Sequence, residues 1–286
     1  MKIFVTGGDG QLGKCLKSFA SKGDTLKFAS RNDLDITNPK EVLSVITAFK
    51  PNIVLHLAAK TRGDDCAKDP KVARLINVRG TRNVIIACKN IGADLLFISS
   101  NEVFDGKKRT PYSEKDKPNP ISIVGKQKFQ AEQAIRNSMR NYYIVRTMWL
   151  YSEYSSNFLQ AIFDKARKNV RVRIVDDEIG SPTSTAELAR AILKLIKTKK
   201  YGIYHLANRG QASRYEFAMV ALNAAEISNI KILPVKLSDY KRLSPPPKYS
   251  PLSSAKAEKL GILFSDWKVP LIQFVKKNKE YLSNTS

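Results

Sequence analysis

Glycines gather in residues 6–13, directly after the apolar run at residues 3–5 and at the start of a helical apolar pattern. A strand that turns through glycines into a helix can seat a pyrophosphate, because free backbone N–H groups and the positive end of the helix dipole face the anion. The glycines fit two phosphate-binding spacings, with Gly8, Gly10 and Gly13 or with Gly7, Gly10 and Gly13. An ordinary strand-to-helix turn is the alternative, and the position between a strand and a helix favours dinucleotide binding.

Alternating strand and helix patterns must position this turn. Short, continuously apolar runs predict strands at residues 2–6, 25–29, 53–57, 94–99 and 142–147. Amphipathic patterns predict the helices between them, at residues 11–21, 39–49, 72–92 and 123–138. Because continuously apolar strands suit a parallel sheet covered on both faces, the alternation predicts an α/β fold with a doubly wound (Rossmann) sheet.

The pattern loosens in the second half of the chain. Helices are predicted at residues 157–167, 185–197, 215–225 and 271–281, with a strand at residues 202–206. We expect residues 1–150 to form the dinucleotide-binding domain, with contributions from residues 170–210. Residues 151–286 are expected to form mainly a smaller, partly interleaved lobe that binds substrate.

Composition limits the class of protein and its compartment. With 286 residues and 43% apolar side chains, the chain can bury a full core. No apolar run approaches the ~20 residues that a membrane helix needs, and the N-terminus lacks the pattern of a signal peptide. Cys15, Cys66 and Cys88 have no metal-ligand spacing and suit reduced thiols. We therefore expect a cytoplasmic protein without a metal site.

The formal net charge of +23 is unusual. Lysine and arginine are spread along the whole chain, and the sequence has no basic tail and no zinc-finger spacing. A solvated lysine-rich surface is the simplest interpretation, and an acidic protein partner is compatible with it. Nucleic-acid binding is the disfavoured alternative. The densest basic cluster, residues 165–173, could bind an anion or supply the cations that favour a helix C-terminus.

Several further segments carry a resemblance to a known family. They are residues 5–13, 33–37 (Asp-Leu-Asp-Ile-Thr), 56–59 (His-Leu-Ala-Ala), 99–106 (Ser-Ser-Asn-Glu-Val-Phe-Asp-Gly), 125–128 and 180–183 (Gly-Ser-Pro-Thr). Along almost its whole length the chain resembles the dTDP-4-dehydrorhamnose reductase-like group of the extended short-chain dehydrogenase/reductases. The resemblance implies reduction of a 4-keto nucleotide sugar with NADP or NAD.

The resemblance also implies where the cofactor binds. It places Gly7, Gly10, Gln11, Leu12 and Gly13 around the pyrophosphate, and Asp35 and Ile36 beside the adenine. Its remaining cofactor residues are Ala58, Ala59, Thr61, Asn77, Ser99 and Lys128. Arg31 follows the second predicted strand, where a guanidinium could pair with the 2′-phosphate of NADP, so NADP is slightly preferred over NAD. A solvated loop arginine is the alternative.

The catalytic pattern departs from the family. In this superfamily a tyrosine supplies the proton to the carbonyl oxygen, a lysine four residues later lowers its pKa, and a serine or threonine hydrogen-bonds the carbonyl. Lys128 and Ser100 match the lysine and the hydroxyl residue, whereas the tyrosine position holds Val124, which has no proton to donate. Asn101 and Glu102 stand where the family tends to have Asp-Tyr. Glu102 is a substitute acid only if burial or a neighbouring charge raises its pKa.

The resemblance implies a substrate pocket bordered by Phe104, Asp105, Trp149, Ser181 and Thr183. An indole offers a flat face on which a sugar ring can stack.

Two functions stay open at this point. One is an NAD(P)H-dependent reductase of a 4-dehydro-6-deoxy nucleotide sugar with a degenerate active site. The other is a catalytically weak or inactive regulatory subunit that binds NAD(P) or a nucleotide sugar. A homodimer is compatible with either.

Overall fold

The computed structural model describes residues 1–286 except 21–22, 155–157, 169–170, 229 and 280–286. Its centre is a six-stranded sheet with the strand order β10-β5-β4-β3-β1-β2, and each neighbouring pair is parallel. The strands are β1 (Lys2–Thr6), β2 (Thr25–Ala29), β3 (Ile53–His56), β4 (Asp94–Ser100), β5 (Tyr142–Thr147) and β10 (Gly202–His205). The prediction of a doubly wound parallel sheet is confirmed.

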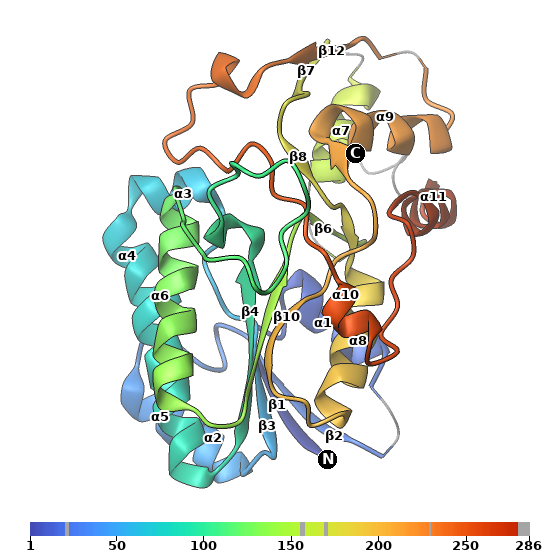
Figure 1. Ribbon diagram of the computed structural model, residues 1–286. Helices are drawn as coiled ribbons and strands as arrows, with labels where there is room; N and C mark the ends of the chain where they lie inside the picture. Colours follow the sequence, from blue (N-terminus) through green and yellow to red (C-terminus); the bar gives the residue numbers. More distant parts are fainter. Residues whose placement is uncertain (21–22, 155–157, 169–170, 229, 280–286) are drawn as a thin grey trace.

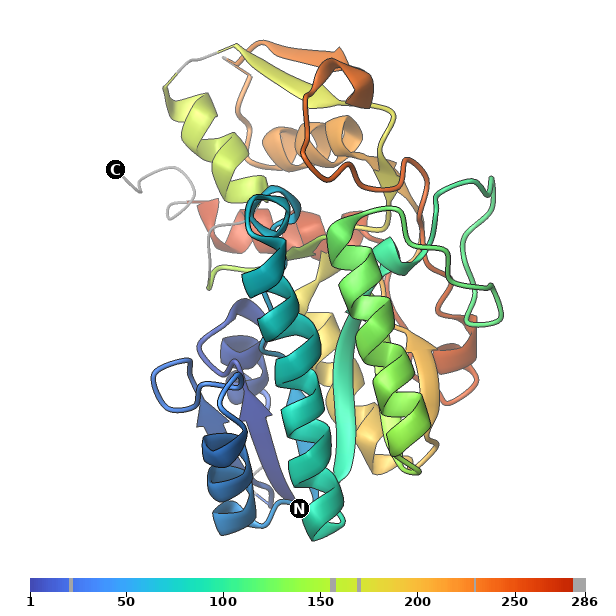
Figure 2. The same ribbon diagram turned by 90° about the vertical axis from the view of Figure 1, so that its left-hand side faces the viewer.

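Helices cover both faces of this sheet (Figures 1 and 2). One face carries α2 (Pro39–Phe49), α5 (Thr81–Ile91) and α6 (Ile123–Ser138). The other carries α1 (Gln11–Ser18), α8 (Thr185–Lys197) and α10 (Ala255–Glu258). Helix α8 and strand β10 lie within residues 170–210, from which contributions to the first domain were expected.

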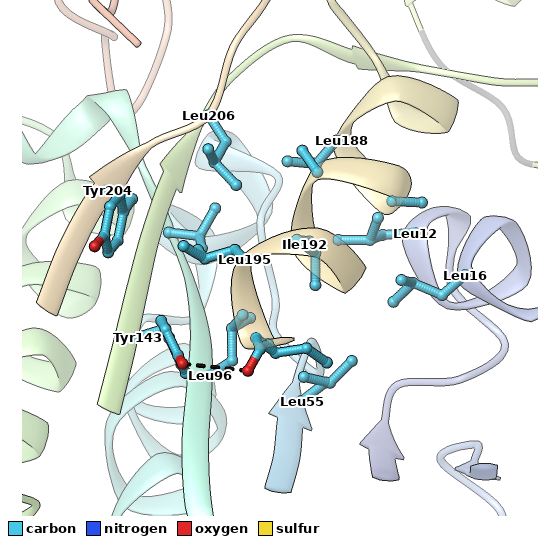
Figure 3. Packing of buried hydrophobic residues seen from close by; sticks show 14 of the residues in the cluster. Leu12, Leu16, Leu55, Leu96, Tyr143, Leu188, Ile192, Leu195, Tyr204 and Leu206 are labelled. Carbon is cyan, nitrogen blue, oxygen red and sulfur yellow. Dashed lines mark hydrogen bonds between the residues drawn. The ribbon is translucent and has the colours of Figure 1, made fainter. Parts of the chain in front are cut away.

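The core follows from the alternation of side chains along the strands. On β1, Ile3 and Val5 point into the cluster with α1 and α8, while Phe4 points into the cluster with α2 and α5. Figure 3 shows the first cluster, in which Leu12 and Leu16 of α1 face leucine and isoleucine side chains of α8. A strand that is apolar on both faces is thereby buried on both faces, as the sequence predicted.

One predicted helix, residues 72–92, is instead a composite. The structure has α3 (Gly63–Lys68), α4 (Pro70–Arg74), a π-helix η1 (Leu75–Gly80) and then α5. The Asp69 side chain caps α4 by accepting from Val72 N, and Gly92 ends α5 in the left-handed conformation. The wider π turn matters because it carries Asn77, one of the predicted cofactor residues.

The remaining elements form a lobe at the upper end of the sheet in Figure 1. Its core joins α7 (Phe158–Arg167), α9 (Arg214–Ala224) and α11 (Lys268–Lys277) with β7 (Val172–Val175), which pairs with β12 (Ile232–Val235). Short strands β6 (Leu150–Tyr151), β8 (Ile179–Gly180), β9 (Thr183–Ser184) and β11 (Ala212–Ser213) connect the lobe to the sheet, and η2 (Asn101–Val103) and η3 (Leu237–Asp239) are single 3₁₀ turns.

Some sequence predictions fall on residues outside the described ranges: residue 21 of the first helix, residue 157, residues 169–170 of the basic cluster, and residues 280–281. In the ranges that are described, no helix is both long enough and apolar enough to cross a membrane. Cys15, Cys66 and Cys88 are buried free thiols.

Candidate active site

Two cavities lie near the glycine turn. The first, of about 480 Å³, is called here the cofactor cavity. It is lined by Gly7, Asp9, Gly10, Ser30, Arg31, Leu34, Asp35, Ile36, Thr37, Leu57, Ala58, Ala59, Lys60, Val72, Leu75 and Ile76. Seven of the predicted cofactor residues therefore border one space: Gly7, Gly10, Arg31, Asp35, Ile36, Ala58 and Ala59.

The glycine turn needs its glycines. Gly7 has φ +68, and a Cβ on it would lie 2.8 Å from Ala58 N. A Cβ on Gly13 would lie 2.6 Å from the carbonyl oxygen of Gly8. The N-cap of α1 is Gly10, which offers no side chain to the first helical N–H groups. A helix that begins without a side-chain cap can bind an anion through backbone N–H groups, as in dinucleotide sites.

The far wall of the cofactor cavity is shaped by a turn after β2. The Asp35 carboxylate accepts from the backbone N (2.9 Å) and the hydroxyl (2.8 Å) of Thr37, which fixes the turn beside Ile36. The Ile36 side chain packs on Gly80 of the π-helix, where a Cβ would lie 2.7 Å from Ile36 Cδ1. Arg31 is exposed on this wall. The expected role of Arg31 next to an adenosine phosphate stays a prediction.

Buried polar groups hold the loop that follows β3. Asn77 clamps Lys60 through two 2.8 Å bonds, accepting from the Lys60 N and donating to its carbonyl, and donates a third to Gln127 Oε1. His56 bridges Thr6 Oγ1 at 2.8 Å and Thr81 Oγ1 at 3.1 Å, and burial lowers the pKa of His56 to about 3. A neutral imidazole therefore acts as a connector between β1 and α5. Asn77 positions the loop and α6 and does not line the cofactor cavity.

The second cavity, of about 620 Å³, is called here the reaction cavity. It is lined by Gln11, Thr61, Arg62, Gly63, Asp64, Ile98, Ser99, Ser100, Asn101, Glu102, Val124, Lys128, Thr147, Met148, Trp149, Leu150, Glu178, Arg214, Arg242, Ser244 and Pro246. Gln11, Thr61 and Ser99, which were expected to touch the cofactor, line this space. So do the four residues of the predicted catalytic set, Ser100, Glu102, Val124 and Lys128.

Lys128 enters the reaction cavity from α6. Its Nζ donates to the carbonyl of Ile98 at 2.7 Å and lies 4.7 Å from the centre of the Phe97 ring. Burial lowers the pKa of Lys128 to about 8, while the charge of Glu132, one helical turn away, acts in the opposite direction. At neutral pH the group is mostly charged and close to titration, which suits a lysine that acts electrostatically.

An ion pair supports this wall from behind. Arg146 on β5 binds Glu132 through two bonds, Nε to Oε1 at 2.9 Å and the terminal nitrogen to Oε2 at 2.6 Å, and both side chains are fully buried. Ser99 donates to the same carboxylate at 2.5 Å. The pair therefore ties β4, β5 and α6 together at the level of Ser100 and Lys128.

The upper wall holds the predicted Trp149 and three residues that the sequence reasoning missed, Glu178, Arg214 and Arg242. Trp149 has φ +47, and the guanidinium of Arg214 lies 3.6 Å above its ring. Glu178, which is buried, pairs with Arg214 at 3.0 Å and with Arg242 at 3.5 Å. Charged residues of this kind are common on surfaces, and no local pattern distinguishes them. These residues come together at the reaction cavity only because α9 and the loop after η3 fold over the sheet.

The side chains of the other predicted substrate residues interact with protein groups outside the reaction cavity. Phe104 is fully buried and stacks on Tyr112, with the two ring centroids 4.1 Å apart. The Asp105 carboxylate accepts a hydrogen bond from the Tyr112 hydroxyl at 2.9 Å. Ser181 donates to the Gly210 carbonyl at 3.0 Å, and Thr183 donates to the Ser181 carbonyl at 2.9 Å. These four side chains stabilise segments next to the reaction cavity, and Trp149 alone of the predicted substrate set lines it.

The fold and the glycine turn at the carboxyl end of β1 define a Rossmann-type dinucleotide-binding protein. The chain belongs to the family described as RmlD substrate binding domain, whose model matches residues 1–280. The family resemblance stated from the sequence is confirmed.

Relatives span almost the whole chain. The spore coat polysaccharide biosynthesis protein SpsK of Bacillus subtilis is 34% identical over 277 residues, which cover 96% of this chain and 97% of that protein. The crystal structure of a dTDP-4-dehydrorhamnose reductase from Clostridium acetobutylicum matches with a TM-score of 0.93 and 35% identity, over 97% of this chain and 99% of that one. The dTDP-4-dehydrorhamnose reductase from Bacillus anthracis, solved in complex with NADP, gives the same score and identity, over 96% and 99% of the two chains. The predicted nicotinamide cofactor agrees with these relatives.

Proposed function

We propose that this chain reduces the 4-keto group of a dTDP-linked 4-dehydro-6-deoxy sugar with NADPH. The observation that carries the proposal is the meeting of Ser100 from β4 and Lys128 from α6 in one cavity of about 620 Å³ beside the glycine turn. Membership of the RmlD substrate binding domain family supports it, as do relatives whose names state this reaction.

The residues present fit a nicotinamide dinucleotide. The glycine turn has no room for a Cβ at Gly7, and α1 begins with no side-chain cap. Gly7, Gly10 and the first turn of α1 would hold the pyrophosphate, with Asp35 and Ile36 near the adenine. Arg31 favours NADP because a guanidinium can bind the additional phosphate. When bound, NADPH supplies the hydride that the carbonyl carbon receives.

Residues of the reaction cavity would orient the sugar. The Ser100 hydroxyl would donate to the carbonyl oxygen, and the Lys128 ammonium would stabilise the negative charge that develops there. Trp149 offers an aromatic face to the ring. Thr147 has a buried hydroxyl that lacks a hydrogen-bond partner among the described residues, and it borders this cavity. An unpaired buried hydroxyl of this kind supports binding of a polar ligand.

One observation favours the second candidate, a weak or inactive binding subunit. Val124, 2% exposed, lines the reaction cavity at the position where the superfamily has its proton-donating tyrosine. Loss of a general acid costs about 10²–10⁴-fold in rate, which slows a reductase without removing cofactor binding.

The test is the loss of NADPH absorbance with a dTDP-4-dehydro-6-deoxy sugar. We expect turnover by the native chain and a loss of at least about 10²-fold for Lys128→Ala, the scale of one electrostatic or acid–base contribution. Lys126→Ala, on the neighbouring exposed position of α6, is the matched control. Saturable NADPH binding with no turnover, and activity gained by Val124→Tyr, would support the binding subunit. Robust native turnover unaffected by Lys128→Ala would contradict the site assignment.

A homodimer, an acidic protein partner and a cytoplasmic location stay predictions of the sequence.

A further inference from the structure

The carboxylate of Glu102 enters the reaction cavity beside position 124. Gly125 at the start of α6 packs directly on the Glu102 backbone, where a Cβ would lie 2.0 Å from the Glu102 carbonyl oxygen. Glu102 and Val124 therefore come from adjoining segments, and both line the reaction cavity with Ser100 and Lys128. An acidic group is thus present next to the place where the tyrosine hydroxyl is missing.

Ser122 fixes the position of this carboxylate. The Ser122 hydroxyl donates to Glu102 Oε2 at 2.5 Å, and the same hydroxyl accepts from the Gly125 N at 3.0 Å as the N-cap of α6. Ser122 is 1% exposed, so solvent does not compete for this bond. With Oε2 held by Ser122, Oε1 is the oxygen that can carry a proton toward the cavity.

The surroundings favour the protonated form of Glu102. Burial raises the pKa of the Glu102 carboxyl, and the charge of Glu178 raises it further. The hydrogen bond from Ser122 and the guanidiniums of Arg214 and Arg242 act in the opposite direction without cancelling the rise. Titratable and charged groups that line the same cavity or act on Glu102 are Arg62 before α3, Asp64 and Cys66 of α3, Lys128 of α6, Glu178 next to β8, Arg214 of α9 and Arg242 after η3.

We propose that Glu102 is the proton donor of the reduction, in place of the tyrosine, and that Ser122 is its positioning residue. The proposal rests on the function proposed above. In the step, the carbonyl carbon gains a C–H bond by hydride transfer from NADPH, which is oxidised to NADP. The electron pair of the C=O π bond moves to the oxygen. The Glu102 O–H bond breaks, an O–H bond forms on the sugar, and Glu102 is left as a carboxylate that solvent reprotonates.

Glu102→Gln tests this step. The amide keeps the size of the side chain and a bond from Ser122, but it has no acidic proton. We expect the rate of the reductive step to fall by about 10²–10⁴-fold, the usual contribution of a general acid, with the NADPH dissociation constant unchanged. Glu226→Gln makes the same change at an exposed carboxylate paired with Lys279, and its rate should equal the native one. Glu102→Asp, which keeps an acidic proton on a shorter side chain, should retain part of the rate.

The pH dependence separates a proton donor from a structural residue. The reaction needs protonated Glu102, so the native rate should fall as the pH rises through its raised pKa. Ser122→Ala removes a bond that stabilises the carboxylate, so this fall should move to higher pH. In Glu102→Gln the fall should disappear, leaving the titration of Lys128 near pH 8. Infrared titration of the protein without ligands gives a readout independent of turnover: the carbonyl band of a protonated carboxyl should persist to higher pH than for an exposed glutamate, and this component should be absent in Glu102→Gln.

The outcomes distinguish the two proposals. Native turnover with an unchanged rate and pH profile in Glu102→Gln overturns Glu102 as the donor and leaves the reductase function standing. No native turnover overturns the reductase function. The infrared titration then still tests Glu102, because a Glu102 carboxyl that titrates like an exposed glutamate overturns the donor role on its own.

Discussion

The two cavities are built in different ways. The part of the cofactor cavity next to β1 and β3 is formed by the glycine turn, Ala58 and Ala59, which have little or no side chain. The reaction cavity gathers side chains from β4, α6, α9 and the loop after η3, and charged groups make up much of its wall. The glycine turn of the first cavity therefore depends on the absence of side chains, and the second cavity depends on the chemistry of its side chains. Substitutions should affect the two in different ways.

The largest effect is expected at the ion pair behind the reaction cavity. Arg146→Leu leaves Glu132 buried without its partner, and removing one member of a buried pair costs about 3–5 kcal/mol of unfolding free energy. Urea unfolding measures this loss. Arg167→Leu breaks a partly exposed pair with Asp164 on α7 and should cost less than about 1 kcal/mol. Equal losses in the two variants would contradict the importance of burial.

The cofactor cavity should respond to an added methyl group. In Gly13→Ala, the new Cβ would lie 2.6 Å from the Gly8 carbonyl oxygen, so the glycine turn must move. Overpacking of this kind costs about 1–3 kcal/mol of unfolding free energy. We expect NADPH to bind about 10-fold more weakly, because the backbone N–H donors of the glycine turn shift. Calorimetric titration gives the dissociation constant. Gly23→Ala places its Cβ in open space and serves as control, and weak NADPH binding by both variants would argue against a specific role of the turn.

The smallest effect is expected on binding of the 2′-phosphate of NADPH. Arg31 is exposed, so Arg31→Ala should weaken NADPH binding by roughly 3- to 10-fold, the scale of one solvent-exposed charge contact, and leave NADH binding unchanged. Arg136→Ala, which removes an exposed guanidinium at the end of α6, is the control. Parallel losses for NADPH and NADH in Arg31→Ala would show that the arginine does not recognise the 2′-phosphate.

The sequence predicted the sheet and the cofactor cavity because both follow from short-range patterns. β1 and β5 each contain three consecutive buried apolar residues, 3–5 and 143–145, and the glycine spacing lies within eight consecutive residues. The composite nature of residues 72–92 was missed because α4, the π-helix and α5 follow one another without a break, and periodicity alone does not record a widened turn.

The reaction cavity was only partly predictable. Ser100, Glu102, Val124 and Lys128 lie in motif-bearing segments, and the structure brings all four together. The pairing of Glu178 with Arg214 and Arg242 joins residues 36 and 64 positions apart, so no local spacing marks it. The rise in the pKa of Glu102 depends on this long-range packing and on burial, which a sequence does not contain.

Trp149 gives this molecule an optical property of its own. The chain has two tryptophans, and the other, Trp267, is 3% exposed in the core of the upper lobe. The indole of Trp149 borders the reaction cavity under a guanidinium, so a molecule that enters there changes its immediate surroundings. Intrinsic fluorescence should therefore follow occupancy of this space without any added label, against a nearly constant background from Trp267.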